Sequence, residues 1–144
     1  MRNFLKSFIF SFIWMVVIII LSLLPTSNLH IPKVISIPHL DKLAHMFMYF
    51  VYTLLLIFGY RIYNQRSFKK SYYLISFVFA ILLGGVTEVA QGILFSSFNR
   101  QKDLMDFLAN SFGATLALII CYLKIDVVVW NWLFRLFRIK LQFS

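Results

Sequence analysis

The sequence contains little charge for its length. Only 13% of its 144 residues are Asp, Glu, Lys or Arg, and 61% are hydrophobic. Water-soluble domains are usually about a quarter charged and about half apolar, so this composition argues against a separate soluble domain. Several apolar runs approach the ~20 residues that a helix needs to cross the hydrocarbon core of a bilayer. The composition therefore predicts a membrane protein that crosses the bilayer several times.

The alternation of apolar and polar residues expected of a membrane β-barrel is also missing. Only helices and closed barrels satisfy their backbone hydrogen bonds inside lipid, so the continuous apolar runs favour helices. We predict an all-α integral membrane fold, a four-helix transmembrane bundle over residues 1–124. Its spans are expected at about 8–24, 43–60, 72–95 and 104–123. Because the connections are short, neighbouring helices should be antiparallel.

Residues 125–144 follow a different pattern. Trp130 and Phe134 recur at helical spacing on one side, and Arg135 and Arg138 recur on the other. This pattern is typical of an amphipathic helix that lies in the membrane interface. A fifth span is less favoured, because it would bury the two arginines in lipid.

Acidic residues are scarce. The chain has five Asp and Glu against 14 Lys and Arg, which gives a formal net charge of +9. We do not predict a nucleic-acid partner, because the basic residues stand between apolar runs, where positive charge sets topology and contacts anionic head groups. Ten of the 14 basic residues lie before the first span, between the second and third spans, or after the fourth. The positive-inside rule then predicts that both termini are cytoplasmic.

The sequence also lacks the usual marks of redox and catalytic chemistry. Its single cysteine, Cys121, excludes an internal disulfide and lies in an apolar run, where a packed side chain is expected. Catalytic spacings such as H-E-x-x-H and G-x-S-x-G do not occur. We assign no cofactor and no set of metal ligands from the sequence.

Polar and ionisable side chains nevertheless interrupt three of the spans, all near the ends predicted to be extracytoplasmic. Within each span most of them recur at intervals of three or four residues, as Asp41, His45 and Tyr49 do, so they share one helix face. Span by span they are Asp41, Lys42, His45 and Tyr49; Glu88 and Gln91; and Arg100, Asp103, Asp106 and Asn110. We predict that these residues form one ligand-binding site.

Glu88 gives the strongest indication of such a site. A charged side chain near the middle of a span costs about 2.5–3.5 kcal/mol, so it should face polar partners or a wet cavity. His45, Asn110 and Arg100 are the candidate partners. The simpler structural interpretation is preferred for Asp41 and for the glycines, which would serve as helix cap and as close packing positions respectively.

Other members of the set have similar structural alternatives. A helix cap is also preferred for Asp103. Gly113 and Ala117 form a small-xxx-small pair of the kind that lets membrane helices approach closely. For Tyr49, a packed ring with a satisfied hydroxyl and a role in binding are equally favoured.

Four segments, in this order, resemble the VanZ-like membrane protein family. They are LSLLP at 21–25, DKLAHMFMY at 41–49, GGVTEVAQ at 84–91 and RQKDLMDFLANSFG at 100–113. The resemblance covers roughly residues 10–123 and excludes the amphipathic tail. The family is named for a protein associated with resistance to the glycopeptide teicoplanin. The resemblance implies a multi-pass protein of the bacterial cytoplasmic (inner) membrane, and it supplies no reaction.

Three classes of function follow. In the first, the site binds or modifies an envelope lipid, a glycan or a glycopeptide antibiotic. In the second, an intramembrane enzyme uses His45, Glu88 and Asp106 for acid/base or metal-dependent chemistry on a lipid head group. In the third, Glu88 titrates in a small proton-coupled carrier, which would need a homo-oligomer. Polar groups gathered toward one side count against a carrier, whose sites are usually near the midplane.

Overall fold

The computed structural model describes residues 4–23, 40–64, 68–94 and 104–123. These residues form four helices, α1 (Phe4–Leu23), α2 (Leu40–Tyr63), α3 (Ser71–Leu94) and α4 (Leu104–Tyr122). No strand occurs in these four ranges. The predicted all-helical fold is confirmed for them, whereas the amphipathic helix expected over 125–144 lies outside the described residues.

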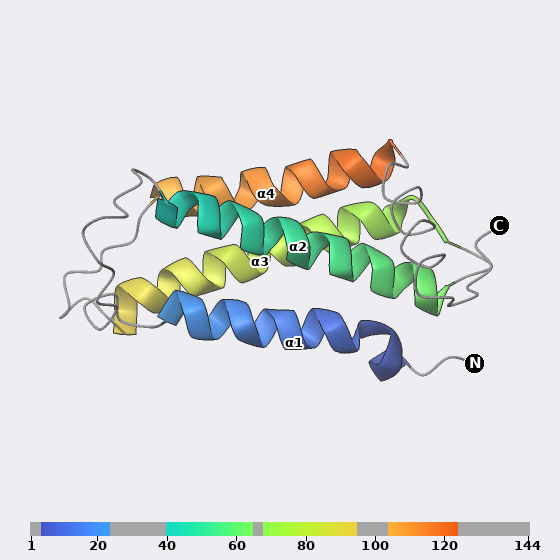
Figure 1. Ribbon diagram of the computed structural model, residues 1–144, viewed down its shortest axis with the longest axis horizontal. Helices are drawn as coiled ribbons and strands as arrows, with labels where there is room; N and C mark the ends of the chain where they lie inside the picture. The colour runs from blue at the N-terminus through green and yellow to red at the C-terminus, as the bar shows by residue number, and fades with distance from the viewer. Residues whose placement is uncertain (1–3, 24–39, 65–67, 95–103, 124–144) are drawn as a thin grey trace.

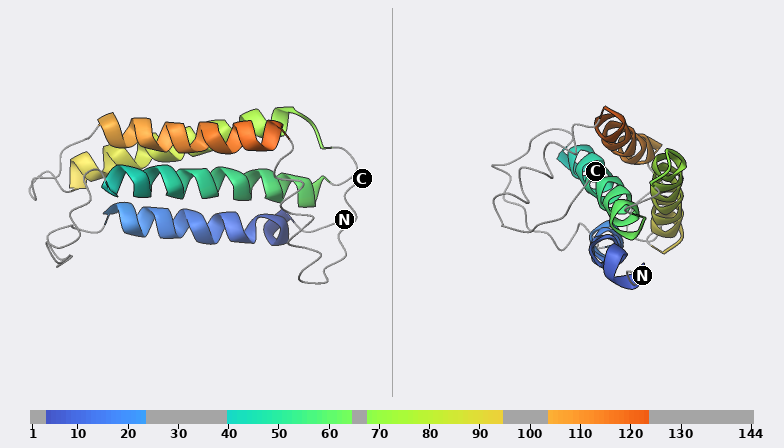
Figure 2. Two further views of the ribbon diagram at one scale, coloured as in Figure 1. Left: turned by 45° about the horizontal axis from the view of Figure 1, so that its top comes forward. Right: turned by 90° about the vertical axis from the view of Figure 1, so that its right-hand side faces the viewer.

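The helices alternate in direction along one common axis (Figure 1). Consequently, α1 and α3 begin at the end of the bundle where α2 and α4 finish. At the opposite end, α2 and α4 begin beside the last turns of α1 and α3. Viewed end-on, α2 lies between α1 and α4, and α3 packs along their side (Figure 2). Among the described residues, α2 contacts all three other helices, whereas α1 contacts only α2 and α3.

All four helices are long and apolar enough to cross a membrane. They contain 19 to 24 residues, which corresponds to about 29–36 Å at a rise of ~1.5 Å per residue. Large apolar side chains point outward from every helix, for example Phe10, Leu43, Leu82 and Phe112. Helices that are apolar on all sides are typical of membrane spans. The second helix starts earlier than the predicted span, so it includes Asp41 and Lys42.

Helices α2 and α4, which begin at the same end of the bundle, pack closely through small side chains. On α4 the buried face consists of Asn110, Gly113, Ala114, Ala117 and Cys121. A Cβ atom on Gly113 would collide with the carbonyl oxygen of Met46 in α2. The close packing predicted for Gly113 and Ala117 is therefore found, and it places the first turns of α2 and α4 side by side. Cys121 is buried, as expected.

Candidate functional site

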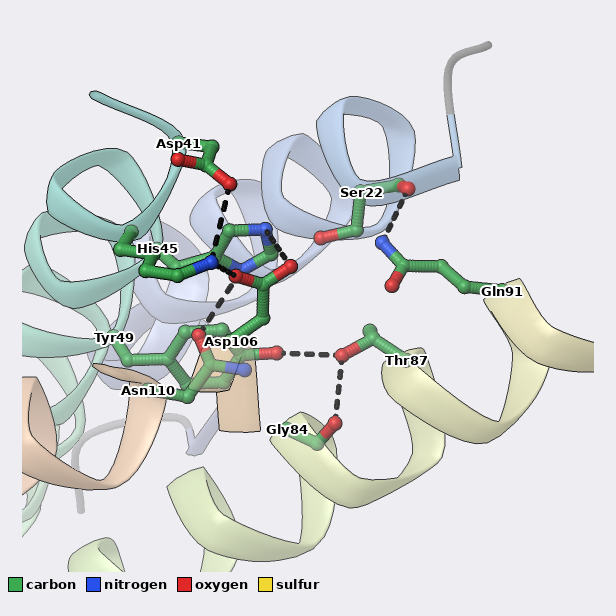
Figure 3. Close-up of polar contacts among 10 residues, drawn as sticks. Ser22, Asp41, His45, Tyr49, Gly84, Thr87, Gln91, Asp106 and Asn110 are labelled. Atoms are coloured by element: carbon green, nitrogen blue, oxygen red, sulfur yellow. Dashed lines mark hydrogen bonds and ion pairs between the residues drawn. The ribbon is translucent and has the colours of Figure 1, made fainter. Parts of the chain in front are cut away.

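A chain of polar contacts joins the first turns of α2 and α4 (Figure 3). The Nζ of Lys42 lies 3.2 Å from Oδ1 of Asp106 and 3.4 Å from Oδ2 of Asp41. The other carboxylate oxygen of Asp106 lies 4.0 Å from Nε2 of His45. The Nδ1 of His45 is 3.1 Å from Oδ1 of Asn110. We call Lys42, His45, Asp106 and Asn110 the polar chain.

Helix periodicity explains why these side chains meet. Residues four apart on α4, Asp106 and Asn110, share one face, and Lys42 and His45 are three apart on α2. Because α2 and α4 run antiparallel to α3 but parallel to each other, their first turns lie at the same level (Figure 1). The spacing read from the sequence placed Asp41, His45 and Tyr49 on one face of α2, whereas the contacts with Asp106 come from Lys42 and His45. The contact between those faces requires the close approach at Gly113.

The polar chain leads from the surface into the bundle. The Asp41 side chain is 62% exposed and that of Lys42 is 26% exposed. The side chains of Asp106 and His45 are 13% and 6% exposed. Asn110 is only 1% exposed. A polar molecule at this end of the bundle would therefore meet charge first and buried hydrogen-bonding groups deeper in.

Helix α3 closes the site from the other side. The hydroxyl of Tyr49 lies 2.9 Å from Oγ1 of Thr87. Thr87 donates its own proton to the carbonyl oxygen of Gly84, at 2.9 Å. The Tyr49 hydroxyl must therefore be the donor to Thr87. Gly84 is packed against both neighbouring helices, because a Cβ atom there would lie 3.4 Å from the Asn110 amide nitrogen and 3.5 Å from the Tyr49 ring.

Glu88 and Gln91 lie about one and two turns beyond Gly84 on α3. Glu88 is 7% exposed, and both carboxylate oxygens are shielded from solvent. This burial agrees with the expectation that it does not face lipid. Gln91 is 2% exposed and donates from Nε2 to the carbonyl oxygen of Ser22, at 2.7 Å. Ser22 belongs to the last turn of α1, where carbonyl groups have no partner within the helix.

The structure thus groups some predicted site residues and separates others. His45, Asp106 and Asn110 meet in one chain (Figure 3). Lys42 joins this chain through Asp106, and Tyr49 contacts α3 beside it. Gln91 instead donates a hydrogen bond to α1. Arg100 and Asp103 lie outside the described residues, so the expected contact of Glu88 with Arg100 and the expected cap at Asp103 stay predictions.

Asp41 does not occupy the expected cap position. It lies within the first turn of α2, which begins at Leu40, and not at the residue before the helix. A carboxylate there still interacts favourably with the positive end of the helix dipole. Its contact with Lys42 connects the exposed rim to the polar chain.

Three interhelical contacts were missed in the sequence. Thr87 lies inside the GGVTEVAQ segment, next to Glu88, and was not predicted as the partner of Tyr49. Ser22 offers only its backbone, so no side-chain pattern could indicate it. Trp14 donates from its indole Nε1 to the carbonyl oxygen of Met48 at 2.9 Å. A tryptophan in a span needs a partner for its N–H, and that signal could have predicted a contact of this kind.

The arrangement allows acid and base chemistry without indicating a metal. Asn110 Oδ1 can only accept a hydrogen bond, so Nδ1 of His45 must carry the proton that it donates to this oxygen. This hydrogen bond orients the imidazole and directs Nε2 toward Asp106. Within the four described ranges, no three His, Cys, Asp or Glu side chains come together as metal ligands would. The metal-dependent form of the enzyme hypothesis therefore gains no support from this part of the chain.

The fold and the site define a four-helix bundle of membrane-spanning type with a buried polar chain at one end. The chain matches no known family profile, no curated protein and no solved structure. The VanZ-like resemblance thus stays a prediction carried by the four sequence segments. Three of those segments supply residues to the site, namely 41–49, 84–91 and, from residue 104 onward, 100–113.

Proposed function

We propose that this protein is a cell-envelope membrane protein whose polar chain binds, or helps to modify, the polar head group of an envelope lipid or glycan. The observation that carries the proposal is the continuous path from exposed Asp41 to buried Asn110. Intramembrane ionisable residues are functional candidates by default. A path that opens at the end of the bundle suits a head group at the membrane surface.

The chemistry of the path suits a ligand with both donors and acceptors. Lys42 presents an ammonium group and Asp106 presents a carboxylate, which together can hold hydroxyl groups of a sugar. Deeper in, the amide Nδ2 of Asn110 is buried and makes no hydrogen bond within the described part of the chain. Such a donor costs about 1–3 kcal/mol when left unsatisfied. A ligand oxygen that reaches Asn110 would recover this free energy.

The distribution of charge supports an orientation for this site. Each charged residue that the structure describes lies toward one end of the bundle or the other. The end with the polar chain carries Asp41, Lys42, Glu88 and Asp106, whereas Lys6, Arg61, Lys69 and Lys70 lie at the opposite end. By the positive-inside rule the basic end faces the cytoplasm. The site then faces the extracytoplasmic side, where envelope glycans are found.

The VanZ-like resemblance supplies the biological setting of the proposal. It implies a bacterial cytoplasmic membrane and makes a glycopeptide antibiotic such as teicoplanin one of the ligands to test. The proposal for this chain does not require that it confers resistance.

Binding can be tested on the full-length protein in lipid nanodiscs. The probes are a lipid-linked cell-wall disaccharide and teicoplanin, each titrated against wild type, Asp106→Asn and His45→Ala. We expect at least one probe to bind, with an affinity that falls by about tenfold or more in both variants, since truncating one partner of a buried charged contact costs at least ~2 kcal/mol. Ser76→Ala is the matched control, because Ser76 is buried and bonds only its own helix in the contact described for it. Equal affinity in all variants would contradict the proposal.

An acid/base enzyme is the second candidate, and one observation favours it. His45 lies between an orienting amide and a carboxylate, as the contacts to Asn110 and Asp106 show. A histidine held in this way can exchange a proton with a bound substrate. Chemical turnover of the lipid-linked probe, lost in His45→Ala, would favour the enzyme, whereas retention without turnover would favour the binder. The carrier hypothesis remains the least favoured, since the polar chain is at one end of the bundle.

A further inference from the structure

The inner end of the polar chain contains a hydrogen-bond donor that lacks a partner. Asn110 Oδ1 accepts the proton of His45 Nδ1, at 3.1 Å. The hydroxyl of Tyr49 donates to Thr87, and the hydroxyl of Thr87 donates to the carbonyl oxygen of Gly84. The amide Nδ2 of Asn110 is buried and makes no hydrogen bond to the residues that the structure describes. What this depth of the site needs is therefore an acceptor.

A glycine on α3 leaves space beside the unpartnered amide. A Cβ atom on Gly84 would lie 3.4 Å from Asn110 Nδ2 and 3.5 Å from the ring of Tyr49, which are ordinary van der Waals distances. A methyl-sized volume at this point is therefore free of protein atoms. The amide bounds it on one side and aromatic carbon bounds it on another, where α2, α3 and α4 meet (Figure 3).

The surroundings of Asn110 favour a neutral acceptor. Asp106 lies one helical turn before Asn110 on the same face of α4, and its side chain is only 13% exposed. An anionic oxygen at Nδ2 would approach this carboxylate in a shielded environment, where like charges repel strongly. A hydroxyl group would bring a proton that needs an acceptor of its own. A carbonyl oxygen accepts hydrogen bonds and carries neither a charge nor a proton.

The depth of the amide suits a substituent on a sugar ring. Asn110 follows Leu104, the first residue of α4, by six residues, which is about 9 Å along the helix axis. A sugar whose hydroxyl groups contact Lys42 and Asp106 nearer the surface can extend one substituent to this depth. An acetamido substituent supplies both a neutral carbonyl oxygen and a methyl group.

We propose that the polar chain selects an N-acetylated amino sugar. Asn110 Nδ2 donates to the acetamido carbonyl oxygen, and the acetamido methyl group lies against Gly84 and the Tyr49 ring. This inference rests on the head-group binding proposed above and narrows the ligand to one chemical class. Asn110 is then the residue that determines specificity, because a site built to donate a hydrogen bond discriminates against a ligand that leaves the donor unpaired.

Three decyl glycosides test this selection on the full-length protein in lipid nanodiscs. They are the N-acetylglucosaminide, the glucosaminide and the glucoside, which carry an acetamido, an amino or a hydroxyl group at the same carbon. Isothermal titration calorimetry measures each affinity, and empty nanodiscs correct for partition into lipid. We expect wild type to bind the acetamido compound about tenfold more tightly than the other two, because only this compound satisfies the buried donor without adding a charge or a proton.

Asn110→Asp tests the role of the amide. It keeps an oxygen that accepts from His45 and replaces the nitrogen with a second acceptor. The order of affinities should therefore reverse, with the hydroxyl and amino compounds bound more tightly than the acetamido compound. A purely structural role of Asn110 would leave the order unchanged. Ser111→Ala is the matched control, because Ser111 is the next residue and donates to the Phe107 carbonyl of its own helix. It should keep the wild-type order.

Gly84→Ala keeps the test valid if Asn110→Asp does not fold. Its methyl group meets its neighbours at ordinary contact distances, so the variant should unfold at the wild-type temperature. It also fills the volume beside Nδ2, and the affinity for the acetamido compound should fall about tenfold. Gly85→Ala is the adjacent control, because its methyl group would lie 3.9 Å from the Phe107 ring and away from the amide. It should bind as wild type does.

Several outcomes would overturn the selection. Equal affinity of wild type for all three glycosides would do so and would leave a less specific head-group site in place. Preference for the amino compound would mean that attraction to Asp106 decides binding, and preference for the hydroxyl compound would mean that the unpartnered atom of Asn110 is an acceptor. Unchanged affinity in Gly84→Ala would exclude the methyl contact. If wild type binds none of the glycosides, the selection is wrong, and the lipid-linked disaccharide and teicoplanin still decide whether the site binds a head group.

Discussion

Gly113 of α4 lies directly against the backbone carbonyl of Met46 in α2, with no room for a Cβ atom between them. The contact is close to the polar chain, because Asn110 precedes Gly113 by one turn and His45 immediately precedes Met46. It brings the two backbones together at the depth where the imidazole and the amide must meet. The packing of α2 on α4 and the geometry of the site therefore depend on the same glycine.

The first prediction concerns this contact. Gly113→Ala should lower the stability of the bundle, because the new methyl group must displace the Met46 backbone and not a flexible side chain. Overpacking of this kind costs about 1–3 kcal/mol. The loss should appear as a lower midpoint of thermal unfolding in detergent. It should also disturb the contact between His45 and Asn110, and hence ligand binding.

Gly85→Ala is the control for this change. At Gly85 the nearest atom to a new Cβ would be in the Phe107 ring, at 3.9 Å, which is an ordinary van der Waals distance. Replacing Gly by Ala inside a helix otherwise favours the helix by up to about 1 kcal/mol. Gly85→Ala should therefore match or exceed wild-type stability. If both alanine variants behave alike, the steric argument for Gly113 is wrong.

The second prediction concerns the bond between Tyr49 and Thr87. A double-mutant cycle with Tyr49→Phe and Thr87→Val should give a coupling free energy of about 0.6 kcal/mol, and no more than about 1.7 kcal/mol, as found for hydrogen bonds between membrane helices. Thermal or denaturant-induced unfolding of the four proteins measures this coupling. A coupling free energy near zero would mean that the hydroxyl and Oγ1 are not bonded in the membrane.

The third prediction compares two carboxylates that both contact Lys42. Asp106→Asn should reduce stability more than Asp41→Asn, because the Asp106 side chain is 13% exposed whereas that of Asp41 is 62% exposed. An exposed ion pair contributes only about 0–1 kcal/mol, and removing one partner of a more buried pair costs more. The two midpoints of unfolding at matched lipid content decide the order. An equal effect of the two substitutions would contradict the graded burial of the polar chain.

Much of the fold follows directly from the sequence. Continuous apolar runs of the right length predicted all four helices, and intervals of three and four residues predicted which polar side chains share a face. These features depend on one helix at a time. His45 and Asp106 could therefore be assigned to one site before any interhelical contact was known.

The remaining features depend on how far each helix is rotated and shifted against its neighbours. Glu88 and Gln91 are three residues apart and share one helix face. Their spacing therefore does not indicate that only the Gln91 amide reaches the last turn of α1. The choice of Thr87 as partner of Tyr49 likewise requires the register between α2 and α3. The indole N–H of Trp14 indicates that a partner is needed, but it does not indicate which backbone carbonyl accepts the hydrogen bond.

The fourth prediction concerns Gln91, whose Nε2 donates to the Ser22 carbonyl. Gln91→Leu should destabilise the packing of α1 on α3 by about 1 kcal/mol, because a carbonyl in the last turn of α1 loses a buried donor. Ligand binding to the polar chain should be unchanged, since this contact belongs to α1 and not to α4. Loss of binding without loss of stability would place Gln91 in the site after all.

The last prediction returns to Glu88, the buried carboxylate in GGVTEVAQ. Glu88→Gln keeps the shape of the side chain and removes the free-energy cost of burying a charge. We therefore expect equal or higher thermal stability, together with weaker binding of the head-group probe, as is common when a functional residue is replaced. Glu88→Leu is the comparison variant, because it also removes all hydrogen-bonding capacity. If Glu88→Gln instead loses the ~3–5 kcal/mol typical of a broken buried ion pair, the carboxylate holds the helices together. The binding role would then belong to the polar chain without Glu88.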